Sequence, residues 1–253
     1  AWPIPRPGCG CDQCAEARRE PALRRTRSGL RIESGDEVVL VDASPDVAYQ
    51  LERDGRPPRI TRLLVTHAHA DHVLGLDDLV NVRIPAEPPL VVHAAPVHRE
   101  RLEAMFPQLV RPGRERIVWD DWEHGSRLEL QDGALVGFET GHHEAFGTTG
   151  VLIEHRRGDA IVRIAVATDM GSPPPSSRER LRGIDRLVGD GTYLGAGGHG
   201  HPGTDAVLAL AAELGIGRVA FTHIGHLGIE DRMLRDRLGP DVAVLRDGQR
   251  LGV

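Results

Sequence analysis

The stretch that decides the fold is RLLVTHAHADHVLGLDDLV, residues 62–80. An apolar run ends at Thr66, an amphipathic segment begins near Val73, and HAHADH between them holds four potential metal ligands in six residues. We predict a strand that ends at Thr66, a loop that carries the ligands, and a helix that starts near Val73. Imidazole and carboxylate ligands suit zinc, manganese or iron. The alternative, a solvated histidine-rich turn, is disfavoured because four ligands at this spacing rarely assemble by chance.

Three further apolar runs each end shortly before a candidate ligand. The runs and their ligands are 134–138 with His142 and His143, 161–168 with Asp169, and 218–222 with His223. Each ligand follows the carboxyl end of a predicted strand, as the 67–72 motif does, so we expect all of them at one edge of the fold. Taken alone, either adjacent histidine would more often be an ordinary surface or core residue.

The HxHxDH motif after an apolar strand resembles the metallo-β-lactamase-fold hydrolase superfamily, whose members bind two metal ions. The resemblance implies an α/β (α+β) fold class, a four-layer αββα sandwich, in a single domain over residues 1–253. It also implies two sets of ligands and a bridge: His67, His69 and His143 for one metal, Asp71, His72 and His223 for the other, and Asp169 between them. The distance to Gly150 in similar proteins favours His143 as the ligand, with His142 beside it in the pocket.

All three cysteines lie in GCGCDQC, residues 8–14. An odd number in one tight cluster is a poor disulfide framework. Cys-x-Cys-x-x-Cys instead resembles three thiolates of a tetrahedral zinc site that needs one outside ligand. We expect His226, three residues after His223, to be that ligand, so that a structural zinc on Cys9, Cys11, Cys14 and His226 attaches the N-terminal loop 8–15 to the ligand edge. A redox or incidental cluster is the alternative.

The cysteine motif followed by EARRE, the HxHxDH core and the THIGH tail at 222–226 together resemble one subgroup over nearly the whole chain. That subgroup is the phosphoribosyl cyclic phosphodiesterase of the carbon–phosphorus lyase pathway. A cofactor-biosynthesis protein that accompanies pyrroloquinoline quinone production carries a similar cysteine motif near its N-terminus. The resemblance implies hydrolysis of a small cyclic phosphodiester by two divalent ions, manganese or zinc with iron as a further candidate. It makes His201 the general acid and Asp71 a second catalytic residue.

The sequence departs from this subgroup in two places. The glycine-rich stretch GAGGHGH, residues 195–201, carries His199 as a competitor of His201. The sequence also opens at Ala1 without a methionine. Because similar proteins begin with a short strand and a glycine-rich turn, we expect a first strand ahead of Ala1.

The chain has 253 residues, which is long enough to bury a sizeable core as one domain. Its formal net charge is −6. No apolar run approaches the roughly 18 residues of a membrane span, and no secretory leader is visible. Reduced thiolates suit the cytoplasm, and the lack of a broad basic surface weighs against a nucleic-acid partner. We expect a cytoplasmic enzyme of a small-molecule substrate without a membrane partner, and a homodimer stays open.

Three other functions compete with the phosphodiesterase. A nuclease of the transfer-RNA-processing type would share the fold and metals, but such enzymes usually carry a basic arm and no such insertion is present. The second is a hydrolase or oxidase that acts on another type of bond. Lactamases lack the bridging aspartate that Asp169 would supply, and thioesterases of this fold add a helical domain that this sequence lacks. A non-enzymatic metal-binding or cofactor-pathway protein is disfavoured because every ligand is present.

Strand clusters that alternate with helices in two halves favour the same sandwich. We expect strands at 31–33, 37–42, 90–93, 117–119 and 128–130, and helices at 178–182 and 207–214. Asp42 follows one of these strands, and either orients a metal-bound histidine or takes a plain turn or cap role.

Overall fold

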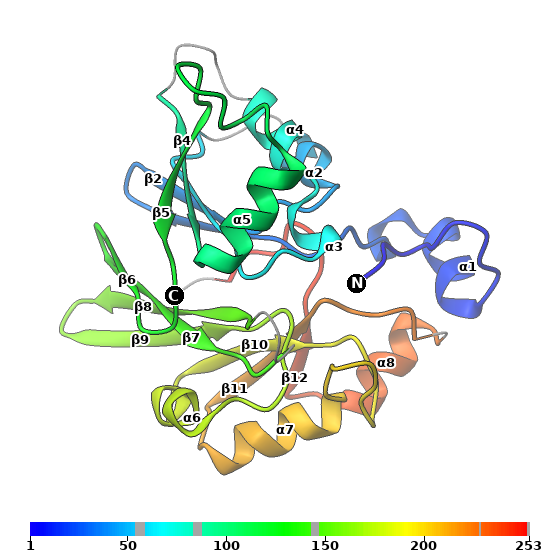
Figure 1. Ribbon diagram of the computed structural model, residues 1–253. Helices are drawn as coiled ribbons and strands as arrows, with labels where there is room; N and C mark the ends of the chain where they lie inside the picture. The colour runs from blue at the N-terminus through cyan, green and yellow to red at the C-terminus, as the bar shows by residue number, and fades with distance from the viewer. Residues whose placement is uncertain (54–58, 83–87, 143–146, 228, 252–253) are drawn as a thin grey trace. The chain divides into compact units, whose positions relative to one another are not determined.

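The computed structural model describes residues 1–53, 59–82, 88–142, 147–227 and 229–251. Within these ranges the chain is mixed α/β and forms two β-sheets (Figure 1). It divides into two compact units: residues 27–137, and a terminal unit formed by residues 1–26 together with 138–253.

The 27–137 unit contains a five-stranded sheet of order β1-β2-β3-β4-β5. Its elements are β1 (Leu30–Ser34), β2 (Glu37–Val41), α2 (Val47–Arg53), β3 (Arg62–Leu64), α3 (Ala70–Val73), α4 (Leu76–Asn81), β4 (Leu90–Ala94), α5 (Pro96–Met105) and β5 (Ile117–Asp121). Strands β2 to β5 run parallel, so their carboxyl ends lie at one edge, and only β1 pairs antiparallel.

The core of this unit lies between the sheet and α2, α4 and α5, which gather on one side of it in Figure 1. Leu63 and Val92 of the sheet pack in the same cluster as Leu76 and Leu102 of the helices, and each is at most 1% exposed. Burying such side chains stabilises the unit by about 1.5–3 kcal/mol each before the entropic cost is counted.

The second sheet has seven strands in the order β12-β11-β10-β9-β8-β7-β6. Its strands are β6 (Arg127–Leu130), β7 (Gly133–Glu139), β8 (Thr149–Arg157), β9 (Ala160–Val166), β10 (Arg186–Asp190), β11 (Arg218–Thr222) and β12 (Val242–Val244). The helices of the terminal unit are α1 (Asp12–Arg19), the 3-10 helix η1 (Pro21–Leu23), α6 (Pro175–Leu181), α7 (Thr204–Glu213) and α8 (Asp231–Leu238). Helix α7 packs on β10 and β11, and α8 packs on β12.

The predicted fold class is confirmed: the chain is mixed α/β, and helices pack on each of its two sheets. The strands expected at 90–93, 117–119 and 128–130 are β4, β5 and β6. In the terminal unit β9, β10, β11 and β12 run parallel. Their carboxyl ends therefore share one edge, as the strand-then-ligand pattern requires.

The structure differs from the sequence-based prediction at the motif itself. Strand β3 ends at Leu64, and a short helix α3 already begins at Ala70, so Asp71 and His72 are helical rather than on a loop. His69 is extended at the N-cap of α3, with φ −74° and ψ 149°. The carboxylate of Asp71 in the first turn suits the positive end of the helix dipole, which favours this earlier start.

Two predicted helices are shifted and several elements were not predicted. Helix α6 starts at Pro175, because proline suits the first helical position, and α7 starts at Thr204 rather than 207. Strand β10 is short and contains a glycine, and α8 is rich in charge, so neither gave a clear apolar period.

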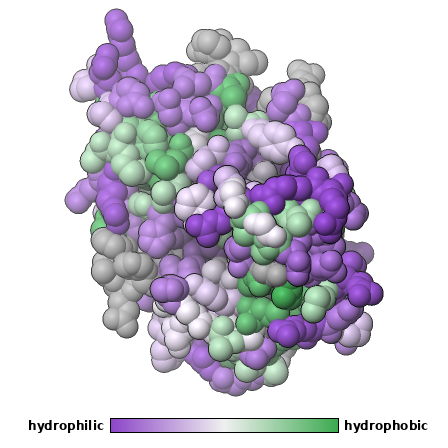
Figure 2. All heavy atoms as spheres, turned by 90° about the vertical axis from the view of Figure 1, so that its right-hand side faces the viewer, coloured by the Kyte–Doolittle hydropathy of each residue, from purple (hydrophilic) through white to green (hydrophobic). Residues whose placement is uncertain are grey.

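Among the described residues, no helix is both long and apolar enough to cross a membrane. The face in Figure 2 is largely hydrophilic, with smaller hydrophobic patches. Trp2, Tyr49 and Ile161 are the most exposed large hydrophobic side chains, at 59%, 63% and 62%. They are widely spaced in sequence, and single exposed apolar residues are normal at protein surfaces.

Candidate metal centre

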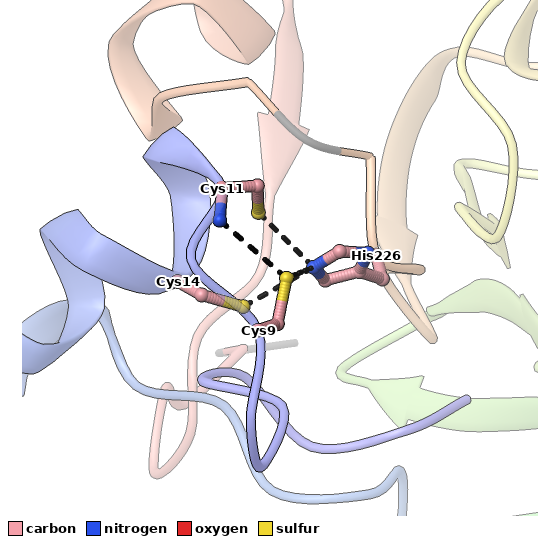
Figure 3. A group of neighbouring side chains, drawn as sticks. All are labelled: Cys9, Cys11, Cys14 and His226. Atoms are coloured by element: carbon pink, nitrogen blue, oxygen red, sulfur yellow. Dashed lines mark hydrogen bonds between the residues drawn. The ribbon is translucent and has the colours of Figure 1, made fainter.

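The three cysteines and His226 come together in the terminal unit (Figure 3). Cys9 and Cys11 precede α1, whereas Cys14 lies in its first turn, so the predicted loop is helical from Asp12 on. The three sulfur atoms lie 3.1, 3.1 and 3.2 Å from Nε2 of His226. A tetrahedral zinc with bonds of about 2.3 Å to sulfur and about 2.0 Å to nitrogen spaces its ligand atoms roughly 3.5 Å apart. The donor set therefore fits zinc.

Backbone groups support this cluster. The N–H of Arg6 donates to Cys14 Sγ at 3.2 Å, and the N–H of Cys11 reaches Cys9 Sγ at 3.5 Å. The Cys11 N–H lowers the pKa of the Cys9 thiol, whereas burial raises the pKa of the Cys14 thiol. Gln13 links α1 to the segment around His226, because its Oε1 accepts the backbone N–H of Leu227 at 2.8 Å. Bonds of this kind orient ligands before a metal is bound.

The 27–137 unit brings four predicted ligands together after β3. His67 Nε2 lies 2.8 Å from Nδ1 of His69, and the ring centroids of His67 and His72 are 4.3 Å apart. The carboxylate Oδ2 of Asp71 lies 3.6 Å from Nε2 of His72. Imidazole nitrogens and a carboxylate oxygen at these separations form a donor set that suits a divalent ion.

Asp42 orients this group from the end of β2. Its Oδ2 accepts a hydrogen bond from His72 Nδ1 at 2.7 Å, and the same oxygen lies 2.9 Å from Thr66 Oγ1. The hydroxyl of Thr66 also contacts His67 Nδ1 at 3.0 Å. Asp42 is thus more than a turn residue: its bond to Nδ1 of His72 leaves the buried Nε2 of that ring available to a metal, which is the orienting role that the sequence analysis gave as one of two alternatives.

In the terminal unit, Asp169 lies among three imidazoles. Its Oδ2 is 3.6 Å from His223 Nε2, and its Oδ1 is 3.9 Å from Nε2 of both His142 and His201. These distances exceed those of hydrogen bonds but match atoms that share a cation. Asp169 is only 2% exposed, and such a buried carboxylate needs compensating charge.

His223 follows β11 and has a left-handed backbone, with φ 52°. The hydroxyl of Thr192 lies 2.8 Å from its Nδ1, which leaves Nε2 facing Asp169. This Nε2 also contacts the backbone amine of Ala1. A non-glycine residue with positive φ is uncommon and marks a position that the surrounding structure determines.

His143, the expected ligand, lies outside the described residues, whereas its neighbour His142 is described and faces this group. His142 is 3% exposed and its Nδ1 donates to the carbonyl of Gly200 at 2.9 Å. Gly141 determines this placement: its φ is 71°, and a Cβ there would lie 2.0 Å from the carbonyl oxygen of Ser172. Burial lowers the pKa of His142, so its imidazole is neutral and available as a donor near neutral pH.

Asp190, which the sequence analysis missed, holds His201. Asp190 ends β10 and is fully buried, and its Oδ2 accepts a hydrogen bond from His201 Nδ1 at 2.6 Å. Its Oδ1 accepts from Thr192 N at 2.9 Å. The sequence signal for it is weak, because RLVGD ends in a carboxylate but holds only two large apolar residues.

Burial alone would raise the pKa of Asp190. The hydrogen bond from His201 and the nearby imidazole of His223, 3.7 Å away, outweigh this effect and hold the pKa of Asp190 at about 2. The carboxylate is therefore charged throughout the physiological range and favours an N–H on Nδ1 of His201. His199, the competing histidine, is exposed and lies in none of the metal-ligand groups found among the described residues.

A beta-lactamase superfamily domain is matched over residues 37–224, which is most of the chain. The protein belongs to the metallo-β-lactamase-fold hydrolases. A crystal structure of a diphosphatase from the PhnP family is similar over 99% of this chain and 92% of its own, with a TM-score of 0.82 and 26% identity. The crystal structure of zinc-bound PqqB from Methylobacterium extorquens has the same fold. It is similar over 100% of this chain and 97% of its own, with a TM-score of 0.78 and 22% identity.

Among curated proteins, ribonuclease Z from Bradyrhizobium sp. is 34% identical over 289 residues, covering 92% of this chain and 96% of its own length. The chain spans just over half the length, 58% and 56%, of the ribonuclease Z proteins from Exiguobacterium sp. and Methanothermobacter thermautotrophicus that it also matches. The histidine–aspartate groups among the described residues could hold divalent metal, which agrees with membership of this family. The expected resemblance to the metallo-β-lactamase-fold hydrolases is therefore confirmed, and the chain is similar to a diphosphatase of the PhnP family within them.

Proposed function

We propose that this protein is a phosphodiesterase that hydrolyses a small cyclic phosphate, such as a phosphoribosyl cyclic phosphate, with two divalent metal ions. The observation that carries the proposal is the Asp190–His201 pair, which holds a histidine beside the buried carboxylate of Asp169. A proton donor beside a metal-ligand group is what cleavage of a poor alkoxide leaving group requires. The similarity to the PhnP-family diphosphatase supports the same class of chemistry.

The proposed ligands are those that the family resemblance implies. One metal would take His67, His69 and a histidine of the 142–143 pair, the other would take Asp71, His72 and His223, and Asp169 would bridge them. We place His142 ahead of His143 as the third ligand because its imidazole already lies in the Asp169 group. Manganese, zinc or iron bound there would lower the pKa of a water molecule and polarise the phosphoryl oxygen.

Four protein groups carry the rest of the reaction. Asp169 would serve as a ligand to both ions, and Asp71 would serve as a catalytic ligand to one of them. Asp190 keeps the proton on His201 Nδ1, so Nε2 of protonated His201 can donate to the leaving oxygen. As the water oxygen bonds to phosphorus, the bond from phosphorus to the ester oxygen breaks, and that oxygen takes the proton. A cyclic substrate is left as a phosphomonoester.

We also propose that the whole chain acts as one hydrolase domain. A structural zinc on the cysteines and His226 would hold segment 8–15 to the loop after β11. Its ligand set is complete, so this zinc would have no open position for a substrate. The proposed partner is a small-molecule phosphodiester, in a cytoplasmic monomer or homodimer.

The test is a substrate panel. Purified protein loaded with manganese or zinc would be assayed on a ribose cyclic phosphate, bis(4-nitrophenyl) phosphate, a β-lactam, a thioester and a precursor transfer RNA. The proposal predicts turnover of the cyclic and aryl phosphodiesters and none of the lactam or thioester. Turnover of the lactam or thioester without phosphodiester cleavage would overturn it.

A second candidate is a ribonuclease of the Z type, favoured by the 34% identity to the Bradyrhizobium protein over nearly both chains. It would use the same ligands and the same proton donor on a macromolecular substrate. The panel separates the two candidates, because a nuclease would cleave the precursor RNA with a kcat/KM far above that for any small cyclic phosphate.

A further inference from the structure

The two residues that follow β10, Gly191 and Thr192, lie against the end of β11, where Thr222 is followed by His223. The N–H of Gly191 donates to the carbonyl of Thr222 at 2.8 Å. A side chain at Gly191 would not fit, because its Cβ would lie 2.8 Å from that same carbonyl oxygen. This close approach of the two backbones brings the hydroxyl of Thr192 next to the imidazole of His223.

The hydroxyl of Thr192 joins two groups of the site. Its oxygen lies 2.6 Å from Oδ1 of Asp190 and 2.8 Å from Nδ1 of His223. A hydroxyl has one proton to donate, and an ionised carboxylate can only accept. The carbonyl of His223 is a further acceptor, but at 3.3 Å it is the more distant one. The hydroxyl therefore donates to Asp190, and its oxygen accepts the N–H of His223 Nδ1.

This direction of donation selects one tautomer of His223. With its proton on Nδ1, a neutral imidazole carries its lone pair on Nε2. Nε2 of His223 is the atom that lies 3.6 Å from Oδ2 of Asp169. A histidine binds a metal ion through such a lone pair, whereas the other tautomer would point an N–H at the same place. The contact with Thr192 thus prepares His223 to be a ligand.

The two oxygens of Asp190 serve different imidazoles. Oδ1 accepts hydrogen bonds from the backbone N–H of Thr192 at 2.9 Å and from its hydroxyl. Oδ2 accepts from Nδ1 of His201 at 2.6 Å and from the backbone N–H of Met170 at 3.2 Å. One buried carboxylate therefore orients His201 directly and His223 through Thr192. Removal of the Thr192 hydroxyl would break the second connection and leave the first in place.

We propose that Thr192 is a positioning residue for the metal centre: its hydroxyl holds His223 in the tautomer that a metal ion requires, and it does so separately from the proton donor His201. This inference rests on the proposed function, in which His223 is a metal ligand. Loss of a hydrogen bond that orients a ligating imidazole typically weakens metal binding about 10–100-fold. Thr192→Val nearly preserves the shape of the side chain but removes the hydroxyl, so it isolates this contribution.

The first measurement uses the wild-type protein. NMR spectroscopy of zinc-loaded protein with isotope-labelled histidine distinguishes the two ring nitrogens of each imidazole, and His223→Ala assigns the signals of His223. We expect a proton on Nδ1 of His223 and zinc on Nε2. A His223 ring without a proton on Nδ1 would overturn the proposal.

The second measurement is the affinity of the active site for zinc, titrated against a competing chelator. Thr192→Val should bind zinc about 10–100-fold more weakly than the wild type, whereas Thr192→Ser should stay near the wild type because it keeps the hydroxyl. Thr222→Val is the matched control, since it removes a threonine hydroxyl one residue away from His223. At saturating zinc, Thr192→Val should keep the wild-type ratio of kcat for alkyl and aryl phosphodiesters, because His201 keeps its bond to Asp190.

Unchanged zinc affinity in a folded Thr192→Val protein would overturn the proposal, as would an equal loss in Thr192→Ser or a changed ratio of kcat. Thermal unfolding shows whether Thr192→Val folds, and if it does not, the tautomer of His223 in the wild type decides. If the wild type hydrolyses neither phosphodiester, the proposed function fails, whereas zinc affinity and the tautomer of His223 still decide the role of Thr192.

Discussion

Asp42–His72 in the 27–137 unit and Asp190–His201 in the terminal unit are the same chemical pair in two settings. Each aspartate lies at or just after the carboxyl end of a parallel strand and accepts a hydrogen bond from Nδ1, at 2.7 and 2.6 Å. Both carboxylates are at most 1% exposed, but the side chain of His72 is 1% exposed and that of His201 is 15% exposed. An enclosed imidazole suits a metal ligand, whereas an imidazole open to solvent can exchange its proton.

The largest expected effect removes the carboxylate proposed to join the metal ligands. Asp169→Ala should abolish phosphodiesterase activity and weaken both active-site ions, because a bridging carboxylate belongs to two coordination spheres. Activity assays with elemental analysis check this, and Asp185→Ala is a control at an aspartate outside the group. Two tightly bound ions and a near-normal rate in Asp169→Ala would show that Asp169 does not bridge.

The comparison itself predicts different losses for the two supporting aspartates. Asp42→Asn should weaken metal binding about 10–100-fold, because His72 loses its orientation. Asp190→Asn should chiefly lower kcat, by about 10–100-fold, since His223 retains the contact with Thr192. Metal titrations and steady-state kinetics on both variants are the measurements. If both variants lost metal equally and neither lost kcat at saturating metal, the two pairs would play the same role.

The closed cysteine site should affect stability rather than the reaction. Cys11→Ser should release one zinc per chain and lower the unfolding temperature, because metal binding at a structural site contributes directly to folding. Ala15→Ser in the same helix is the matched control. A purified protein without zinc, whose three cysteines react freely with thiol reagents, would remove this site from the account.

The smallest effect concerns His93 at the end of β4, which is 2% exposed. Burial lowers its pKa and outweighs the attraction of Asp120 at 3.2 Å. The unfolded chain therefore takes up a proton first as the pH falls below about 6.5, so stability is lost in that range. His93→Leu should flatten this loss, by at most about 1.4 kcal/mol per pH unit, and His124→Leu at an exposed position should not. Denaturant unfolding between pH 5 and 8 checks this.

Much of the fold could be predicted because apolar runs and the metal ligands follow one another in a regular order. Asp42, Asp169 and His223 each follow an apolar run, and the structure places each of them shortly after the carboxyl end of a strand. The pattern did not reveal Asp190, because RLVGD has only two large apolar residues. The pattern alone did not separate His142 from His143; the family resemblance favoured His143, which lies outside the described residues.

His201→Ala tests most directly the claim that an open imidazole held by a buried aspartate is the proton donor. The rate constant kcat would be measured on a cyclic or alkyl phosphodiester and on an activated aryl phosphodiester, with metal content recorded. We predict a loss on the order of 10²–10⁴-fold for the alkoxide leaving group and a much smaller loss for the aryl one, with both metals retained. Equal losses on both substrates, or a larger leaving-group-dependent loss in His199→Ala, would contradict the assignment.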